Sequence, residues 1–146
     1  MSKALFIFGF IVIILIVGAF SYTFYNSSKS VVEIKGYDFQ VELAKTDKDK
    51  QIGLSKYKNL PKDQGMLFVF DKAGFYPFWM KDMKFPIDII FIKNSRIVTI
   101  YQNLPIDNLN IYSPTSPSDK VIEINANLSK KYGFGIGDSV IFKNIK

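Results

Sequence analysis

The chain opens with a long apolar segment that no charged side chain interrupts. Residues 4–25 contain no Asp, Glu, Lys or Arg, and fourteen of these 22 positions are Ile, Val, Leu or Phe. A helix of this length spans about 33 Å, which is enough to cross a hydrocarbon core of about 30 Å. Lys3 is the only charged side chain before the segment, and positively charged flanks stay on the cytoplasmic side. The pattern therefore predicts a single transmembrane helix over residues 4–25, with the rest of the chain outside the cytoplasm.

A cleavable signal peptide is the alternative interpretation of this segment. Residues 19–21 read Ala-Phe-Ser, which resembles the small-x-small pattern at which signal peptides are cut, and cleavage would release a secreted protein. The apolar run is longer than the usual signal core of about 7–15 residues, so we favour an uncleaved anchor. Residues 1–29 are then a membrane segment with a short polar linker, and residues 30–146 form one exported domain.

In the exported domain the apolar positions recur with the short period of β-strands. In residues 37–43, Phe39, Val41 and Leu43 alternate with polar side chains. Residues 87–92 are nearly all apolar, which is typical of a strand buried on both faces. The domain is therefore expected to be mainly β with one or two short helices, in a β-sandwich or barrel. The other predicted strands cover residues 31–34, 66–70, 75–80, 97–101, 121–124 and 139–142, and the predicted helices cover 46–55 and 127–133.

The composition excludes several classes of functional site. The chain has no His and no Cys, so it holds no Ser-His-Asp or Cys-His nucleophile, no thiolate or imidazole zinc site and no disulfide. We expect neither a metal nor a cofactor, and acid–base chemistry would fall to carboxylates, Lys or Tyr. The formal charge is +6, and without Lys3 and Lys29 the 17 basic and 13 acidic residues leave +4. That excess is too small to indicate a nucleic-acid partner. We also expect the protein to be a monomer.

Several short motifs follow one another in the order and spacing of a known family. They are Gly53-Leu54, Leu60-Pro61, Gly65-Met66-Leu67-Phe68-Val69-Phe70, Phe78-Trp79-Met80-Lys81, Pro86-Ile87-Asp88-Ile89, Val121-Ile122-Glu123-Ile124 and Gly137-Asp138. Over residues 37–142 the chain resembles the bacterial and archaeal family called domain of unknown function 192. The resemblance implies a compact β-sandwich of jelly-roll type and no established activity. Lys50 and Tyr57 stand where the family usually has arginines. Any binding of an anionic ligand that those arginines provide in other members is therefore weaker or absent in this chain.

Four residues are the candidate ligand-binding site. Trp79 and Lys81 share one face of a predicted strand, and an aromatic platform beside a cation is a common contact for sugars and other small ligands. Asp88 lies in an apolar strand and needs a partner, which Lys81 would supply. We predict that Trp79, Lys81 and Asp88, together with Glu123, line one pocket. The alternative makes Trp79 a core anchor, Lys81 a solvated neighbour, Asp88 an acceptor that holds the turn after Pro86, and Glu123 part of a solvated strand face.

These residues support three kinds of function. We favour a non-catalytic module that binds a glycan or another small polar molecule at the cell surface, with the membrane as a partner through residues 4–25. A glycan hydrolase is the alternative, in which Asp88 and Glu123 would form a carboxylate pair about 5–9.5 Å apart. A structural or protein-binding accessory domain is the third possibility. The absence of His and Cys favours the non-catalytic interpretation.

Overall fold

The computed structural model describes residues 12–14, 16, 29–106 and 109–145. The chain divides into two compact units, residues 1–29 with residue 146, and residues 30–145. In the first unit, residues 12–14 and 16 are helical, and the remainder of the helix predicted over residues 4–25 lies outside the described residues. Within the described part of the chain, no helix has the length and apolar character needed to cross a membrane. The transmembrane helix over residues 4–25 therefore stays a prediction.

The second unit is mainly β, as the apolar pattern predicts. Two short α-helices and one 3-10 turn accompany the strands in the described residues: α2 is Asp47–Ile52, η1 is Gly53–Lys56 and α3 is Leu128–Lys131. The strands are β1 (Val31–Ile34), β2 (Tyr37–Ala44), β3 (Gln64–Gly74), β4 (Phe78–Trp79), β5 (Ile87–Lys93), β6 (Arg96–Leu104), β7 (Ile111–Tyr112), β8 (Ser118–Asn125) and β9 (Val140–Lys143).

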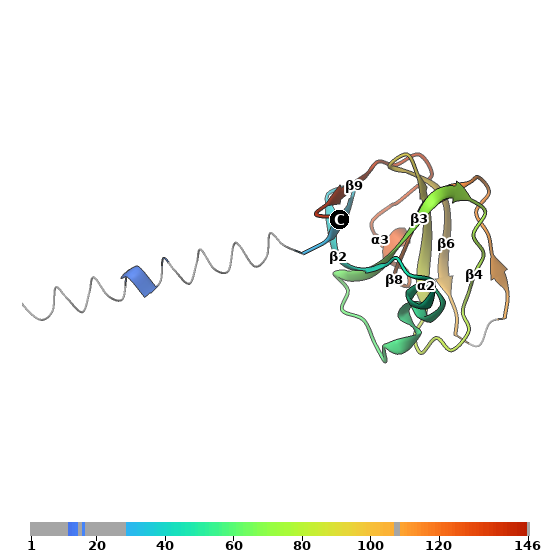
Figure 1. Cartoon of the computed structure of the whole chain (residues 1–146), viewed down its shortest axis with the longest axis horizontal. Coiled ribbons are helices and arrows are strands. Elements are labelled where there is room, and N and C mark those ends of the chain that lie inside the picture. Colours follow the sequence, from blue (N-terminus) through green and yellow to red (C-terminus); the bar gives the residue numbers. More distant parts are fainter. Residues whose placement is uncertain (1–11, 15, 17–28, 107–108, 146) are drawn as a thin grey trace, which may run out of the picture. The chain divides into compact units, whose positions relative to one another are not determined.

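Seven of these strands form one continuous sheet in the order β6-β5-β8-β3-β2-β1-β9. β2 and β3 are parallel, and the other neighbours are antiparallel. A jelly roll pairs two separate antiparallel sheets, so the expected jelly-roll sandwich differs from this single curled sheet (Figure 1). The reason is the connection through α2 and η1, which returns the chain to the same end of the sheet and makes β3 parallel to β2.

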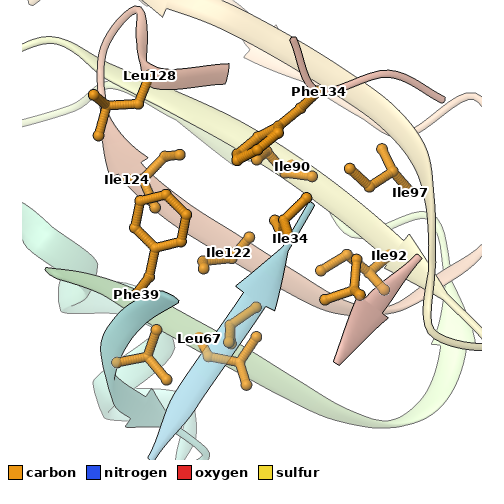
Figure 2. Packing of buried hydrophobic residues seen from close by; sticks show 13 residues of the cluster. Ile34, Phe39, Leu67, Ile90, Ile92, Ile97, Ile122, Ile124, Leu128 and Phe134 are labelled. Carbon is orange, nitrogen blue, oxygen red and sulfur yellow. The ribbon is translucent and has the colours of Figure 1, made fainter. Parts of the chain in front are cut away.

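The curl of the sheet brings its two ends together around a hydrophobic core. Ile34 on β1 and Ile97 on β6 come from opposite ends of the strand order, yet both belong to one buried cluster (Figure 2). Hydrogen bonds join the same two ends, because the Ile97 N–H donates to the Asp138 carbonyl at 3.0 Å and the Val140 N–H donates to Ser95 at 2.9 Å. The face that carries this cluster is therefore the inside of a half-barrel.

The opposite, outer face of the sheet carries a second core cluster. It contains Met66 and Phe68 from β3, Ile89 and Phe91 from β5, and Val121 from β8. The pieces that cover it come from η1, from β4 and from the small sheet that β4 forms with β7. Loop residues such as Leu60, Met80 and Phe85 complete the cover of the outer face, and the candidate site lies between these pieces and the sheet.

Most predicted strands are confirmed, and three details differ. The segment 87–92 is buried at every position, as its apolar run predicts. β3 continues through a bulge to Gly74, beyond the strand predicted over 66–70, and the strand predicted over 75–80 shrinks to Phe78–Trp79. β7 lies between the strands predicted over 97–101 and 121–124 and has only two residues, too few to leave a period in the sequence.

Candidate functional site

A cavity of about 310 Å³ lies on the outer face of the sheet. Its walls come from the α2–η1 segment, from β3, from the chain between Tyr76 and Met83, and from β8. A volume near 300 Å³ is at the small end of the range for ligand pockets and fits a ligand about as large as one sugar ring. The lining residues are Asp47, Lys50, Gln51, Ile52, Gly53, Phe68, Phe70, Tyr76, Pro77, Phe78, Trp79, Lys81, Met83 and Glu123.

One wall of the cavity is the short helix α2, which begins and ends at residues that favour helix termini. Thr46 caps α2, since its hydroxyl accepts a hydrogen bond from the Asp49 N–H at 3.1 Å. Gly53 ends α2 with a φ of +52° and a ψ of −144°, a conformation that side chains rarely adopt. A Cβ at this glycine would lie 3.4 Å from Phe68 Cζ and 3.7 Å from Glu123 Oε2. These distances are ordinary van der Waals contacts, so the positive φ, and not lack of space, favours glycine at the end of the helix.

Glu123 on β8 forms the floor. Its side chain is only 4% exposed, and burial raises the pKa of the carboxyl group to about 8, against a smaller lowering by a hydrogen bond from the Leu54 backbone. Among the described residues, Glu123 Oε2 has no hydrogen-bond partner although it is fully buried. At neutral pH the group is therefore mostly a neutral carboxylic acid with spare hydrogen-bonding capacity.

Aromatic rings and two lysines form the remaining walls. Phe70 and Tyr76 stack with ring centroids 3.7 Å apart and an interplanar angle of 7°. Lys50 Nζ lies 4.7 Å from the centroid of the Phe70 ring, and Lys81 Nζ lies 6.0 Å from that of Trp79. Trp79 is 55% exposed, although it is the largest apolar side chain in the lining. The cavity thus offers an indole ring at its mouth and a neutral carboxyl at its floor.

The structure brings together three of the four predicted site residues. Trp79, Lys81 and Glu123 all line the cavity, and Asp88 does not. Lys81 lies in the turn that follows β4, so it reaches the cavity without sharing a strand face with Trp79. The solvated strand face proposed as the alternative for Glu123 is wrong, because this side chain is buried.

Asp88 is fully buried on the inner face of the sheet and is held by backbone donors. Its Oδ1 accepts hydrogen bonds from the N–H groups of Asn103 at 2.7 Å and Asn127 at 2.9 Å, and its Oδ2 accepts one from Ser129 at 2.8 Å. These bonds tie the end of β6 and the start of α3 to β5. The predicted Lys81–Asp88 pair is therefore replaced by a structural role, close to the alternative that made Asp88 an acceptor in a turn.

The pairing of β5 with β8 explains why Asp88 leaves the cavity. Asp88 pairs with Ile124, whereas Glu123 pairs with Ile89. Paired residues on neighbouring strands point to the same face, and successive residues alternate between faces. Asp88 therefore shares the inner face with Ile124, and Glu123 shares the outer face with Ile89. A glycosidase pair of Asp88 and Glu123 in one cleft is excluded.

Several residues that line the cavity cannot be predicted from the sequence. Asp47 and Lys50 are recognisable as first-turn and last-turn residues of α2, but nothing in their spacing says that the helix covers Glu123. Gly53 was visible only as part of the family motif. Within the part of the chain that the structure describes, no three acidic side chains are grouped so as to hold a metal ion.

Comparisons with known proteins agree with this architecture. The family model for domain of unknown function 192 (DUF192), described as "Uncharacterized ACR", matches residues 30–142. A protein of unknown function from Novosphingobium aromaticivorans DSM 12444 is 28% identical with a TM-score of 0.72, covering 77% of this chain and 83% of that one. A "putative transcription regulator" from Sinorhizobium meliloti 1021 is 28% identical with a TM-score of 0.73, covering 80% of this chain and 94% of that one. None of the curated proteins compared with the chain matches it.

Proposed function

The chain belongs to the DUF192 family, and we propose that its β-rich domain is a non-catalytic module that binds a small cyclic ligand, such as one sugar unit of a glycan. The ligand would occupy the cavity between α2, the segment from Tyr76 to Met83, and the outer face of the sheet. The observation that carries this proposal is the state of Glu123, a buried carboxyl group with an unpartnered oxygen at the floor of an aromatic cavity.

The two buried acids of the sheet make the argument sharper. Asp88 does not face the cavity, and backbone N–H groups donate hydrogen bonds to both of its carboxyl oxygens. Glu123 is buried just as deeply, yet Oε2 has no partner among the described residues. A buried polar atom without a partner costs about 1–3 kcal/mol. A group that bears this cost at the floor of a cavity is suited to a hydrogen bond with a ligand.

The walls favour a ring-shaped ligand with polar edges. Trp79 presents an exposed indole on which the apolar face of a sugar ring can stack. Protonated Glu123 can donate a hydrogen bond to a hydroxyl or ring oxygen of that ligand and accept another. Phe68, Phe78 and Met83 give the lining an apolar part, as in most small-molecule pockets, beside its charged side chains.

For the glycan-hydrolase alternative, Glu123 still lines the cavity, but Asp88, its predicted partner, does not. A raised pKa suits a general acid, but a glycosidase needs a second carboxylate beside it. Among the described residues, Asp47 is the only other acidic residue of the lining, and it is solvent-exposed in the first turn of α2. We therefore place binding ahead of hydrolysis, and release of reducing ends from an oligosaccharide by the purified chain would reverse that order.

The test is binding of a panel of mono- and oligosaccharides to the full-length chain, kept in a polyoxyethylene detergent that contains no sugar. Saturation-transfer NMR detects the bound sugar without a label. We expect Trp79→Ala to weaken binding about twofold to tenfold, because a stacked ring contributes on the order of 0.5–1.5 kcal/mol. Phe75→Ala is the matched control, since Phe75 is 60% exposed and does not line the cavity. The proposal fails if no sugar binds, or if both substitutions weaken binding equally.

We further propose that residues 4–25 anchor the chain in a membrane and that the β-rich domain acts outside the cytoplasm. The support is the uncharged apolar run behind Lys3. A location outside the cytoplasm is consistent with a glycan ligand.

A further inference from the structure

Among the described residues, two acidic and two basic side chains line the cavity, and neither of the two lysines forms an ion pair. The four are Asp47, Lys50, Lys81 and Glu123. In the described part of the chain, four other lysines form ion pairs with carboxylates, but neither Lys50 nor Lys81 does. Their ammonium groups lie instead over the rings of Phe70 and Trp79.

The net charge of the cavity lining depends on whether the Glu123 carboxyl group is ionised. Burial keeps Glu123 neutral at pH 7, with a pKa of about 8. Two lysines and one ionised aspartate then leave a net charge of +1 around the cavity. A cationic ligand would meet two ammonium groups over the aromatic faces and no ionised carboxylate at the floor.

We infer that the cavity selects a cyclic polar ligand that carries an anionic group, with that group at Lys50 and Lys81 and a neutral polar edge at Glu123. The inference rests on the proposed function and names the chemical class of its ligand. An acidic sugar meets the description, whether its anionic group is a carboxylate or a phosphate. Lys binds both as a point charge, so the shared chemistry is the negative charge on the ring substituent.

The experiment compares sugars that differ mainly in charge. Glucose, glucuronate, glucose 6-phosphate and glucosamine are each titrated into the full-length chain, and binding is followed by the emission of Trp79, the chain's only tryptophan. Two half-exposed charge pairs predict that the anionic sugars bind about twofold to thirtyfold more tightly than glucose. The preference should shrink as salt is raised, because exposed pairs are screened. Equal gains for glucuronate and glucose 6-phosphate support a general anion preference, and a gain for one of them identifies the anionic group.

Lysine variants separate a site from a generally basic surface. Lys50→Met and Lys81→Met should each lower the ratio of the affinity for the anionic sugar to the affinity for glucose. Their controls are Lys48→Met, on the same helix as Lys50, and Lys84→Met, three residues after Lys81, because neither control residue lines the cavity. A preference that survives in the Lys50→Met, Lys81→Met double variant overturns the inference.

The failure of this inference can be told apart from the failure of the proposed function. If glucose binds as tightly as glucuronate and glucose 6-phosphate, or if glucosamine binds most tightly, the anion preference is wrong while the cavity remains a sugar site. If none of the four sugars changes the Trp79 emission and none gives a saturation-transfer signal, both the sugar site and its charge preference are wrong.

Discussion

Asp88 and Glu123 lie one register step apart on neighbouring strands, and their carboxyl groups point to opposite faces of the sheet. Three backbone N–H groups bind Asp88 inside the half-barrel, while Glu123 faces the cavity with one oxygen unpartnered in the described structure. Two acids with similar burial therefore have different tasks. Asp88 holds the fold together, and Glu123 is the acid that we propose to contact a ligand.

Replacement of Asp88 should lower the stability of the domain and leave the cavity unchanged. Asp88→Ala removes three hydrogen bonds to a buried carboxylate and leaves their N–H donors without an acceptor, which should lower the free energy of unfolding by about 3 kcal/mol or more. Urea denaturation of the full-length chain measures the loss. Asp71→Ala, at an exposed position of β3, is the control and should cost less than about 0.5 kcal/mol. A loss below about 1 kcal/mol for Asp88→Ala would contradict the structural role.

The raised pKa of Glu123 predicts a decline of stability with pH. The folded chain holds the Glu123 proton up to a pKa of about 8, whereas the unfolded chain releases it near 4.5. Between these values the folded state binds more protons than the unfolded state, so the free energy of unfolding falls as pH rises, by at most about 1.4 kcal/mol per pH unit. The contribution is complete below pH 4.5 and lost above about pH 8.

Glu123→Gln isolates this effect, because the amide keeps the shape and cannot ionise. Denaturation midpoints measured from pH 5 to 8.5 should slope downward for the native chain and be nearly flat for the variant. Glu42→Gln is the control, since the pKa of Glu42 is lowered by its hydrogen bonds to Lys56 and Tyr57, against a raising by burial, and it stays ionised across this range. Parallel slopes for the native chain and Glu123→Gln would show that Glu123 does not hold its proton.

Gly65 on β3 should be intolerant of any side chain. A Cβ at this position would lie 2.7 Å from the backbone oxygen of Glu123 on the neighbouring strand, closer than real Cβ contacts allow. Gly65→Ala must push β3 and β8 apart, and we expect a loss of about 1–3 kcal/mol together with weaker ligand binding, because Glu123 moves with its strand. Gly135→Ala, where the nearest group is the Asp138 carboxylate at 3.8 Å, should cost less. Equal losses in thermal denaturation would mean that the two strands adapt without strain.

The proposed topology predicts which side of the membrane exposes the domain. Protease added to intact spheroplasts that express the chain should digest residues 30–146 and leave a cytoplasmic marker intact. Full protection of the domain would overturn the proposal. A mature product that begins near Tyr22 would favour the cleaved, secreted form.

The amino-acid sequence by itself determined the family, the mainly β class and the position of most strands. These properties depend on local patterns, such as the alternation in β2 and the continuous apolar run of β5. The sequence also singled out Trp79, Lys81 and Glu123, because a Trp beside a Lys and an acid inside an apolar strand are unusual wherever the strands lie.

Only the tertiary structure decided which of these residues meet. The alternation along one strand says that neighbouring side chains face opposite ways, but the register between β5 and β8 decides whether Asp88 and Glu123 share a face. The parallel pairing of β2 with β3 requires a crossover connection, and in the fold this α2–η1 connection lies over the outer face, where Gly53 approaches Glu123. Both features are set by pairing between residues far apart in the chain, and the free energy of that pairing comes from burial of the whole sheet, which no local pattern contains.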